Sequence, residues 1–238
     1  MPLESPSPAT LRFITQVQRA YVSLMQSAAA RSEESLGGTL FYAGELDEPG
    51  RILAVAGNIA GAASLAASAD AAVLRQAMHD GVIDFLVTSL DEALRILKNE
   101  IRKRQPVAVA VSVAPQAIVK EMIERGVLPN LLPQLQPFSA PPEFAAFMAQ
   151  GAERVTAQPL PPGRKFLIWP IPAEFAQRPA EFDALLLEHL PPGDLATRRW
   201  LRLSPRYLGP QARRLRSLAC DEETASKLID VLGLPLQP

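Results

Sequence analysis

Cysteine and histidine are scarce in this chain of 238 residues. Cys220 is the only cysteine, and His79 and His189 are the only histidines. One cysteine excludes a disulfide within the chain and leaves no cysteine-rich metal cage, and two histidines argue against a histidine-based zinc site. These counts fit a reducing compartment, so we expect a cytoplasmic protein.

The chain also lacks an excess of positive or negative charge and lacks long apolar runs. The 24 basic and 25 acidic residues give a net charge of -1, so no global field attracts nucleic acid, an acidic membrane or a polyanionic substrate. Residues 1–13 show no basic segment followed by an apolar core, and no apolar run approaches the roughly 20 residues that span a bilayer. We therefore expect neither a membrane nor a nucleic-acid partner.

Strands and helices alternate through the first half of the chain. Apolar spacing predicts an amphipathic helix from Leu11 that ends near Gly37, followed by a short strand. Asp70 and Ser89 are expected to cap two helices. Apolar runs at 82–88 and 106–113 predict strands, and the second run is uninterrupted, which indicates burial on both faces of a parallel sheet.

Two parts of the chain are less clear. The alanine-rich stretch Ala54–Ala72 favours helix by composition, yet a cap at Asp70 leaves residues 62–68 as an element of their own. After Pro133 prolines are frequent, and short helices alternate with isolated apolar runs. Cys220 is interpreted as a half-buried helix residue rather than a nucleophile.

We therefore predict an α/β fold: a Rossmann-like parallel sheet flanked by helices, with a preceding long helix and a smaller, irregular α+β region at the C-terminal end. The expected divisions are an N-terminal helical segment at 1–36, the Rossmann-like domain at 37–140, and an appendage at 141–238 that packs on the sheet domain.

Three short segments carry a resemblance to a known family. They are Ala56–Gly61, Leu90–Ala93 and Arg125–Val127. With their surroundings they resemble the cofactor-binding middle region of urocanase, the NAD-dependent urocanate hydratase of histidine breakdown, a lyase. The likeness extends from the helix that carries Tyr21 to about Pro141. The small residues of the first segment are interpreted as packing positions that let a helix approach the sheet.

The resemblance implies NAD at the carboxyl ends of the strands, held by a glycine-dense loop after the first strand. Here that loop is Gly44–Gly50, in which Glu45, Asp47 and Glu48 add negative charge and Pro49 removes a backbone donor. In the family's register, Ser68 stands where an acidic residue holds a ribose, Val73 replaces a basic residue, Ala114-Pro115 replaces an Asn-Ala pair, and residues 135–139 replace a polar cluster. We expect no bound cofactor, although the family implies NAD.

Any cleft is expected at the carboxyl ends of the strands. Its predicted lining is Gly44, Glu45, Leu46, Asp47, Ser68, Ala114 and Pro115. The acidic rim favours a neutral or cationic ligand, or none if Leu46 or Ile52 fills the vacated volume. The acidic cluster matches no complete metal site, and no catalytic residue is assigned.

We expect one of two functions, which belong to different classes. The first is a urocanase-like, non-catalytic accessory or ligand-binding paralogue that pairs with itself or with another protein. The alternative is a divergent hydratase or lyase that is completed by a partner subunit or uses an altered cleft. The basic segment 98–104 and the arginines between 198 and 216 could together form a basic patch, but they are interpreted as a solvated face that pairs with nearby acids.

Overall fold

A six-stranded sheet forms the centre of the computed structural model, which describes residues 6–134, 144–156, 160 and 162–232. The strand order is β3-β4-β2-β1-β5-β6, and every neighbouring pair is parallel. The strands are β1 (Leu40–Glu45), β2 (Ala63–Ala67), β3 (Phe85–Val87), β4 (Val107–Val111), β5 (Leu131–Gln134) and β6 (Glu153–Thr156). The predicted Rossmann-like α/β fold is confirmed.

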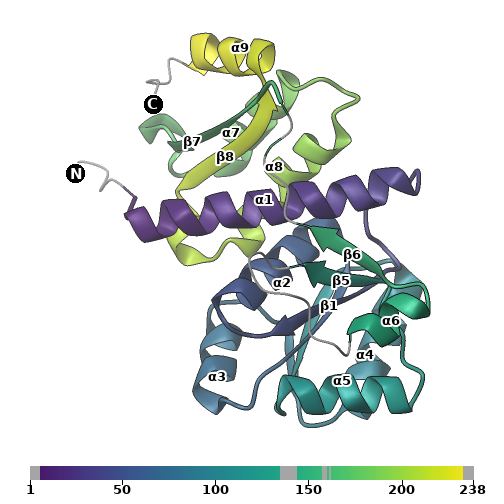
Figure 1. The fold of residues 1–238 in the computed structure, drawn as a ribbon. Coiled ribbons are helices and arrows are strands. Elements are labelled where there is room, and N and C mark those ends of the chain that lie inside the picture. Colours follow the sequence, from purple (N-terminus) through teal and green to yellow (C-terminus); the bar gives the residue numbers. More distant parts are fainter. Residues whose placement is uncertain (1–5, 135–143, 157–159, 161, 233–238) are drawn as a thin grey trace.

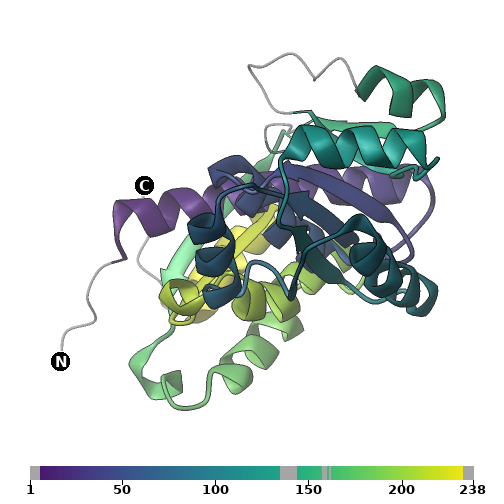
Figure 2. The ribbon, with the colours of Figure 1, turned by 90° about the horizontal axis from the view of Figure 1, so that it is seen from below.

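Helices cover both faces of this sheet (Figures 1 and 2). One face carries α1 (Pro8–Ala30), α2 (Glu48–Ala60) and α3 (Ala71–His79), and the other carries α4 (Leu90–Lys103), α5 (Pro115–Glu124) and α6 (Phe144–Ala149). Asp70 caps α3 and Ser89 caps α4, as predicted. The first helix ends at Ala30, earlier than expected. The segment after it is held at the end of α2, where Leu36 N–H donates to the Ala60 carbonyl.

The ambiguous alanine-rich stretch contains a strand, β2, that is buried along its whole length. Its small side chains suit the place it occupies, because α2 lies very close above it: a Cβ added to Gly57 would lie 2.5 Å from Ser64 Oγ. Pairing with both β1 and β4 therefore overrides the helix preference of alanine. The interpretation of Gly57 as a packing residue agrees with this close approach.

The C-terminal part of the chain packs against α1 and α2. It contains α7 (Pro179–Glu188), α8 (Leu195–Tyr207), α9 (Glu222–Leu232) and an antiparallel pair of β7 (Arg164–Pro170) with β8 (Leu215–Asp221), besides short 3₁₀ turns at Ala173–Phe175 and Pro210–Ala212. In Figure 1, α1 lies between this part and the sheet. The parallel sheet itself continues past residue 140, because β6 pairs with β5.

Cys220 lies on a strand, β8, and not on the predicted helix. Its side chain is 1% exposed, so it is fully buried rather than half-buried. The helix begins only at Glu222, where Asp221 accepts hydrogen bonds from Thr224. Pairing with β7 and packing against α8 hold this segment extended.

None of the helices in the described part of the chain combines the length and the apolar character needed to cross a membrane.

Candidate functional site

The turn between β1 and α2 lies at the carboxyl edge of the sheet, where the resemblance described above predicts a phosphate loop. Gly44 adopts a φ of +88°, a conformation that favours glycine. Leu46 N–H donates to the Ala67 carbonyl at 2.9 Å, and the Leu46 side chain is completely buried. Glu45 is exposed to solvent. The turn is therefore fastened to the end of β2, with its one long apolar side chain folded inward.

Asp47 caps the helix that follows. Its carboxylate accepts a hydrogen bond from Gly50 N–H at 2.9 Å, and Pro49 has no N–H to offer. Only glycine fits at position 50, since a Cβ there would lie 1.7 Å from the Glu45 carbonyl oxygen. A carboxylate of the chain itself thus occupies the position at the helix start where an anion would receive backbone donors.

The other predicted pocket residues make local contacts at the same edge. Ser68 is 3% exposed, and its hydroxyl oxygen accepts a hydrogen bond from Asp70 N–H at 3.2 Å. Ala114 is the residue before α5 and makes no side-chain cap. The Pro115 carbonyl accepts a 3.5 Å hydrogen bond from the buried Tyr42 hydroxyl, whose pKa is raised by burial and by the nearby Glu45 charge. Residues 135–139 lie outside the described residues.

Two cavities lie beside the turn, on the face covered by α1. A shallow cavity of about 470 Å³ includes Leu46 and Asp47 from the predicted set. Its full lining is Phe13, Leu46, Asp47, Glu48, Arg51, Ala72, Val73 and Gln76. Gly44, Glu45, Ser68, Ala114 and Pro115 line neither this cavity nor the next one.

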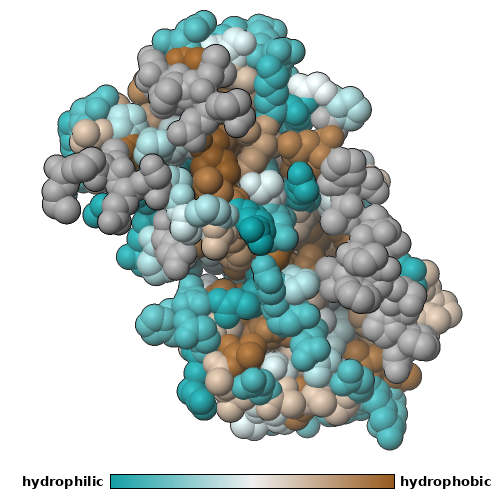
Figure 3. Space-filling view, turned by 60° about the vertical axis from the view of Figure 1, so that its left-hand side comes forward, coloured by the Kyte–Doolittle hydropathy of each residue, from teal (hydrophilic) through white to brown (hydrophobic). Residues whose placement is uncertain are grey.

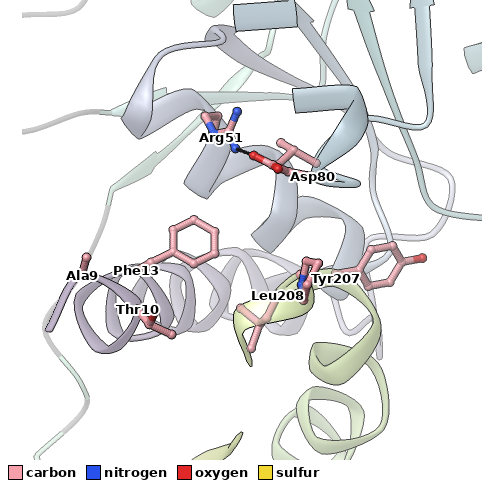
Figure 4. A pocket seen from close by; sticks show the side chains of 10 residues that line it. Ala9, Thr10, Phe13, Arg51, Asp80, Tyr207 and Leu208 are labelled. Carbon is pink, nitrogen blue, oxygen red and sulfur yellow. Dashed lines mark hydrogen bonds and ion pairs between the residues drawn. The ribbon is translucent and has the colours of Figure 1, made fainter. Parts of the chain in front are cut away.

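The neighbouring cavity, of about 280 Å³, shares Phe13 and Arg51 with the first. It extends between the start of α1 and the segment Tyr207–Pro210. In Figure 4, Phe13 projects from α1 toward the side where Arg51 and Asp80 meet, and the Tyr207 ring points away from it. The side of the molecule seen in Figure 3 shows hydrophobic patches between hydrophilic residues.

Arg51 lines both cavities and forms an ion pair of 2.5 Å with Asp80, which lines the second cavity. Asp80 also accepts hydrogen bonds from Gln76 and His79. Burial raises the pKa of Asp80, but the hydrogen bonds from Arg51, His79 and Gln76 outweigh it, so the pKa is lowered overall. Sequence reasoning missed this pair because the partners stand on α2 and after α3 with no local pattern that links them.

The remaining candidates do not form a reactive group. His79 is exposed at the end of α3, and His189 Nδ1 lies 2.9 Å from the Leu185 carbonyl oxygen. Burial raises the pKa of the Cys220 thiol to about 11, which keeps it protonated. Within the described ranges, no group of three or more His, Cys, Asp or Glu side chains is placed to hold a metal ion.

Comparison with known families adds a decisive match. The family model of the urocanase Rossmann-like domain matches residues 15–141, from within α1 to beyond β5. The chain belongs to this family. The match covers more than half of the 238 residues, and the stretch that it leaves out includes β6, β7, β8 and helices α6 to α9.

The turn after β1 does not fit the pyrophosphate of NAD, the cofactor that the resemblance to urocanase implies. A dinucleotide's phosphates need free N–H groups and an uncharged approach at the start of the helix. In this urocanase-family chain, Gly50 N–H is already engaged by Asp47, Pro49 contributes no donor, and Glu48 adds a second carboxylate. Val73 lines the cavity beside the turn.

Proposed function

We propose that this urocanase-family protein is a non-catalytic accessory or ligand-binding protein whose former NAD site has been closed. The observation that carries the proposal is the capping of α2 by Asp47, which fills the anion position with the chain's own carboxylate. Burial of Leu46 under the same turn supports it, because this side chain takes up volume at the edge where a cofactor would lie.

The cavity beside the turn suits a neutral or cationic ligand. Apolar side chains of Phe13, Ala72 and Val73 contribute to its lining, and Asp47 and Glu48 bring negative charge to it. Arg51 also lines this cavity, but its positive charge is paired with Asp80. An anionic ligand would meet two carboxylates here, whereas an amine or an uncharged ring would not be repelled.

Cofactor binding tests the proposal directly. We expect isothermal titration calorimetry to detect no NAD binding by the purified protein, and native mass spectrometry to detect no NAD that copurifies with it. A urocanase with an intact glycine-rich loop serves as the positive control. Micromolar NAD binding, or NAD present in near-equal amount, would contradict the proposal and restore the divergent-enzyme alternative.

Activity gives a second, independent test. Loss of urocanate absorbance in the ultraviolet measures hydration of urocanate, and we expect none from this protein alone. The proposed inertness of Cys220 belongs to the same test. Turnover that disappears in Cys220→Ser would refute both the non-catalytic function and the structural role of this cysteine.

A further inference from the structure

Three arginines of α8 converge on a cavity at the opposite edge of the sheet. The cavity has a volume of about 300 Å³ and is lined by Glu34, Ser35, Leu195, Arg198, Arg199, Arg202 and Leu203. It lies by the loop before β1 and the end of α2, at the amino ends of the strands, so it is separate from the turn that holds Asp47.

Arg199 is fixed in this cavity by backbone contacts. Its Nε donates to the Ile59 carbonyl at 2.7 Å, at the C-terminal end of α2, where a cation is favourable. Gly61 leaves room for the guanidinium, since a Cβ there would lie 2.7 Å from Nη2. The side chain is half-buried, and these contacts fix its conformation in the absence of a ligand.

No carboxylate compensates this partly buried charge. Among the described residues Arg199 makes no ion pair, and neither terminal nitrogen has a hydrogen-bond partner. Burial lowers its pKa, with only Tyr21 and Tyr207 acting in the other direction. Buried charges are ordinarily paired, so a partly buried guanidinium without an acid, whose terminal nitrogens are not buried, is a site that an anion would complete.

The neighbouring arginines extend the positive field. Arg198 donates through Nη1 to the carbonyls of Leu187 and Leu190, which leaves Nη2 without a partner among the described residues. Arg202 is exposed and makes no ion pair in the described part of the chain. Ser35 accepts a hydrogen bond from Gly37 N–H, so its own hydroxyl hydrogen is available. Glu34 is the one acid in the lining.

We propose that this cavity binds a small oxyanion, the phosphate or carboxylate group of a small molecule, through Arg199, Arg198 and Arg202. Guanidinium forks match both groups by paired hydrogen bonds, and the apolar Leu195 and Leu203 accommodate a short carbon skeleton. With three arginines and one glutamate, the lining carries a clear positive excess. The site does not depend on the loss of the NAD loop.

The test is a calorimetric titration of the full chain at low ionic strength with two probes, inorganic phosphate and succinate. We expect saturable binding of at least one probe, weakened by added salt. Binding of phosphate alone assigns the site to phosphate esters, and binding of succinate alone assigns it to carboxylates. If neither probe binds saturably, the proposal is wrong.

Matched variants locate the binding. Arg202→Ala should weaken it about tenfold, the loss expected for one charge-assisted contact, while Arg206→Ala, on the same helix but outside the cavity, should leave it unchanged. Glu34→Gln should tighten it by removing the opposing charge. Since Arg202 has no ion-pair partner among the residues that the structure describes, its variant should keep the parent melting temperature. Equal losses in Arg202→Ala and Arg206→Ala, or no change in either, would overturn the proposed site.

Discussion

Gly50 shows how one residue fixes the shape of the turn between β1 and α2. The carbonyl oxygen of Glu45 lies where a side chain at Gly50 would begin, so β1 and the first turn of α2 are in direct backbone contact. Glycines at this part of a dinucleotide fold allow close packing of helix and strand. Gly50 has that packing role here, while the backbone N–H groups around it are engaged by Asp47 or missing at Pro49.

Gly50→Ala should therefore be strongly destabilising. The new methyl group must push apart backbone atoms that now approach within 1.7 Å of its position, and overpacking of this kind costs about 3 kcal/mol. Gly193→Ala is the matched control, because a Cβ there meets no atom within 4 Å and its φ is ordinary. Urea unfolding measures both, and similar stabilities of the two variants would show that the turn can relax.

Cys220 allows a second prediction at this scale. With its side chain buried and its thiol pKa raised to about 11, the folded protein should react with a thiol reagent at pH 8 far more slowly than the unfolded protein, whose thiol is exposed and ionises more easily. Time courses with and without denaturant measure this. Rapid labelling of the folded chain would mean that β8 opens readily.

At the scale of elements, a buried ion pair joins α7 to β8. Arg216 is only 3% exposed in its side chain, and its Nε and Nη2 both bind the Asp183 carboxylate. Its Nη1 donates to the carbonyls of Arg213 and Leu215. The guanidinium is thus fully engaged, and α7 is held against the two-stranded sheet through one acidic side chain.

Removal of that acid should leave a buried cation without a partner. Asp183→Ala is expected to lower the free energy of unfolding by about 3–5 kcal/mol. Arg178→Ala breaks the exposed Arg178–Glu181 pair, and should cost no more than about 1 kcal/mol. Denaturant titrations of both variants provide the comparison. Equal, small losses would indicate that Arg216 finds water or another acceptor.

At the scale of the whole molecule, the two halves of the chain share one core. Trp200, Leu218 and Leu228 from the C-terminal part belong to the same buried cluster as Tyr21 of α1 and Ile59 of α2. The Trp200 ring lies 5.2 Å from that of Tyr21, whose hydroxyl donates to the Ala196 carbonyl at 2.7 Å. The long first helix is therefore packed on both parts.

We expect a single cooperative unfolding transition. Trp169 and Trp200, the two tryptophans, both lie in the C-terminal part, so fluorescence follows that part while far-ultraviolet circular dichroism follows all helices. A shared core predicts that the two signals change at the same denaturant concentration. Separate midpoints would show that the parallel sheet and the C-terminal part unfold independently.

Local patterns were enough to predict most of the parallel α/β region. Caps at Asp70 and Ser89 and the apolar run of β4 are visible in a few neighbouring residues, because short-range hydrogen bonds and burial on both faces determine them. For the site, the sequence indicated the acidic turn after β1, and the absence of a glycine-rich phosphate loop stays a prediction. It also indicated the family, which the match to residues 15–141 established.

Contacts distant in sequence decided the rest. Alanines of β2 form a strand because β1 and β4 bind it on both sides, and Cys220 lies on a strand because β7 pairs with it. The Arg51–Asp80 pair and the position of Arg199 at the end of α2 depend on side chains that meet only after packing. The sequence alone thus determined which elements form by local energetics and that the turn after β1 is acidic. Only the tertiary structure decided where the cavities lie, since a cavity is bounded by elements that are remote along the chain.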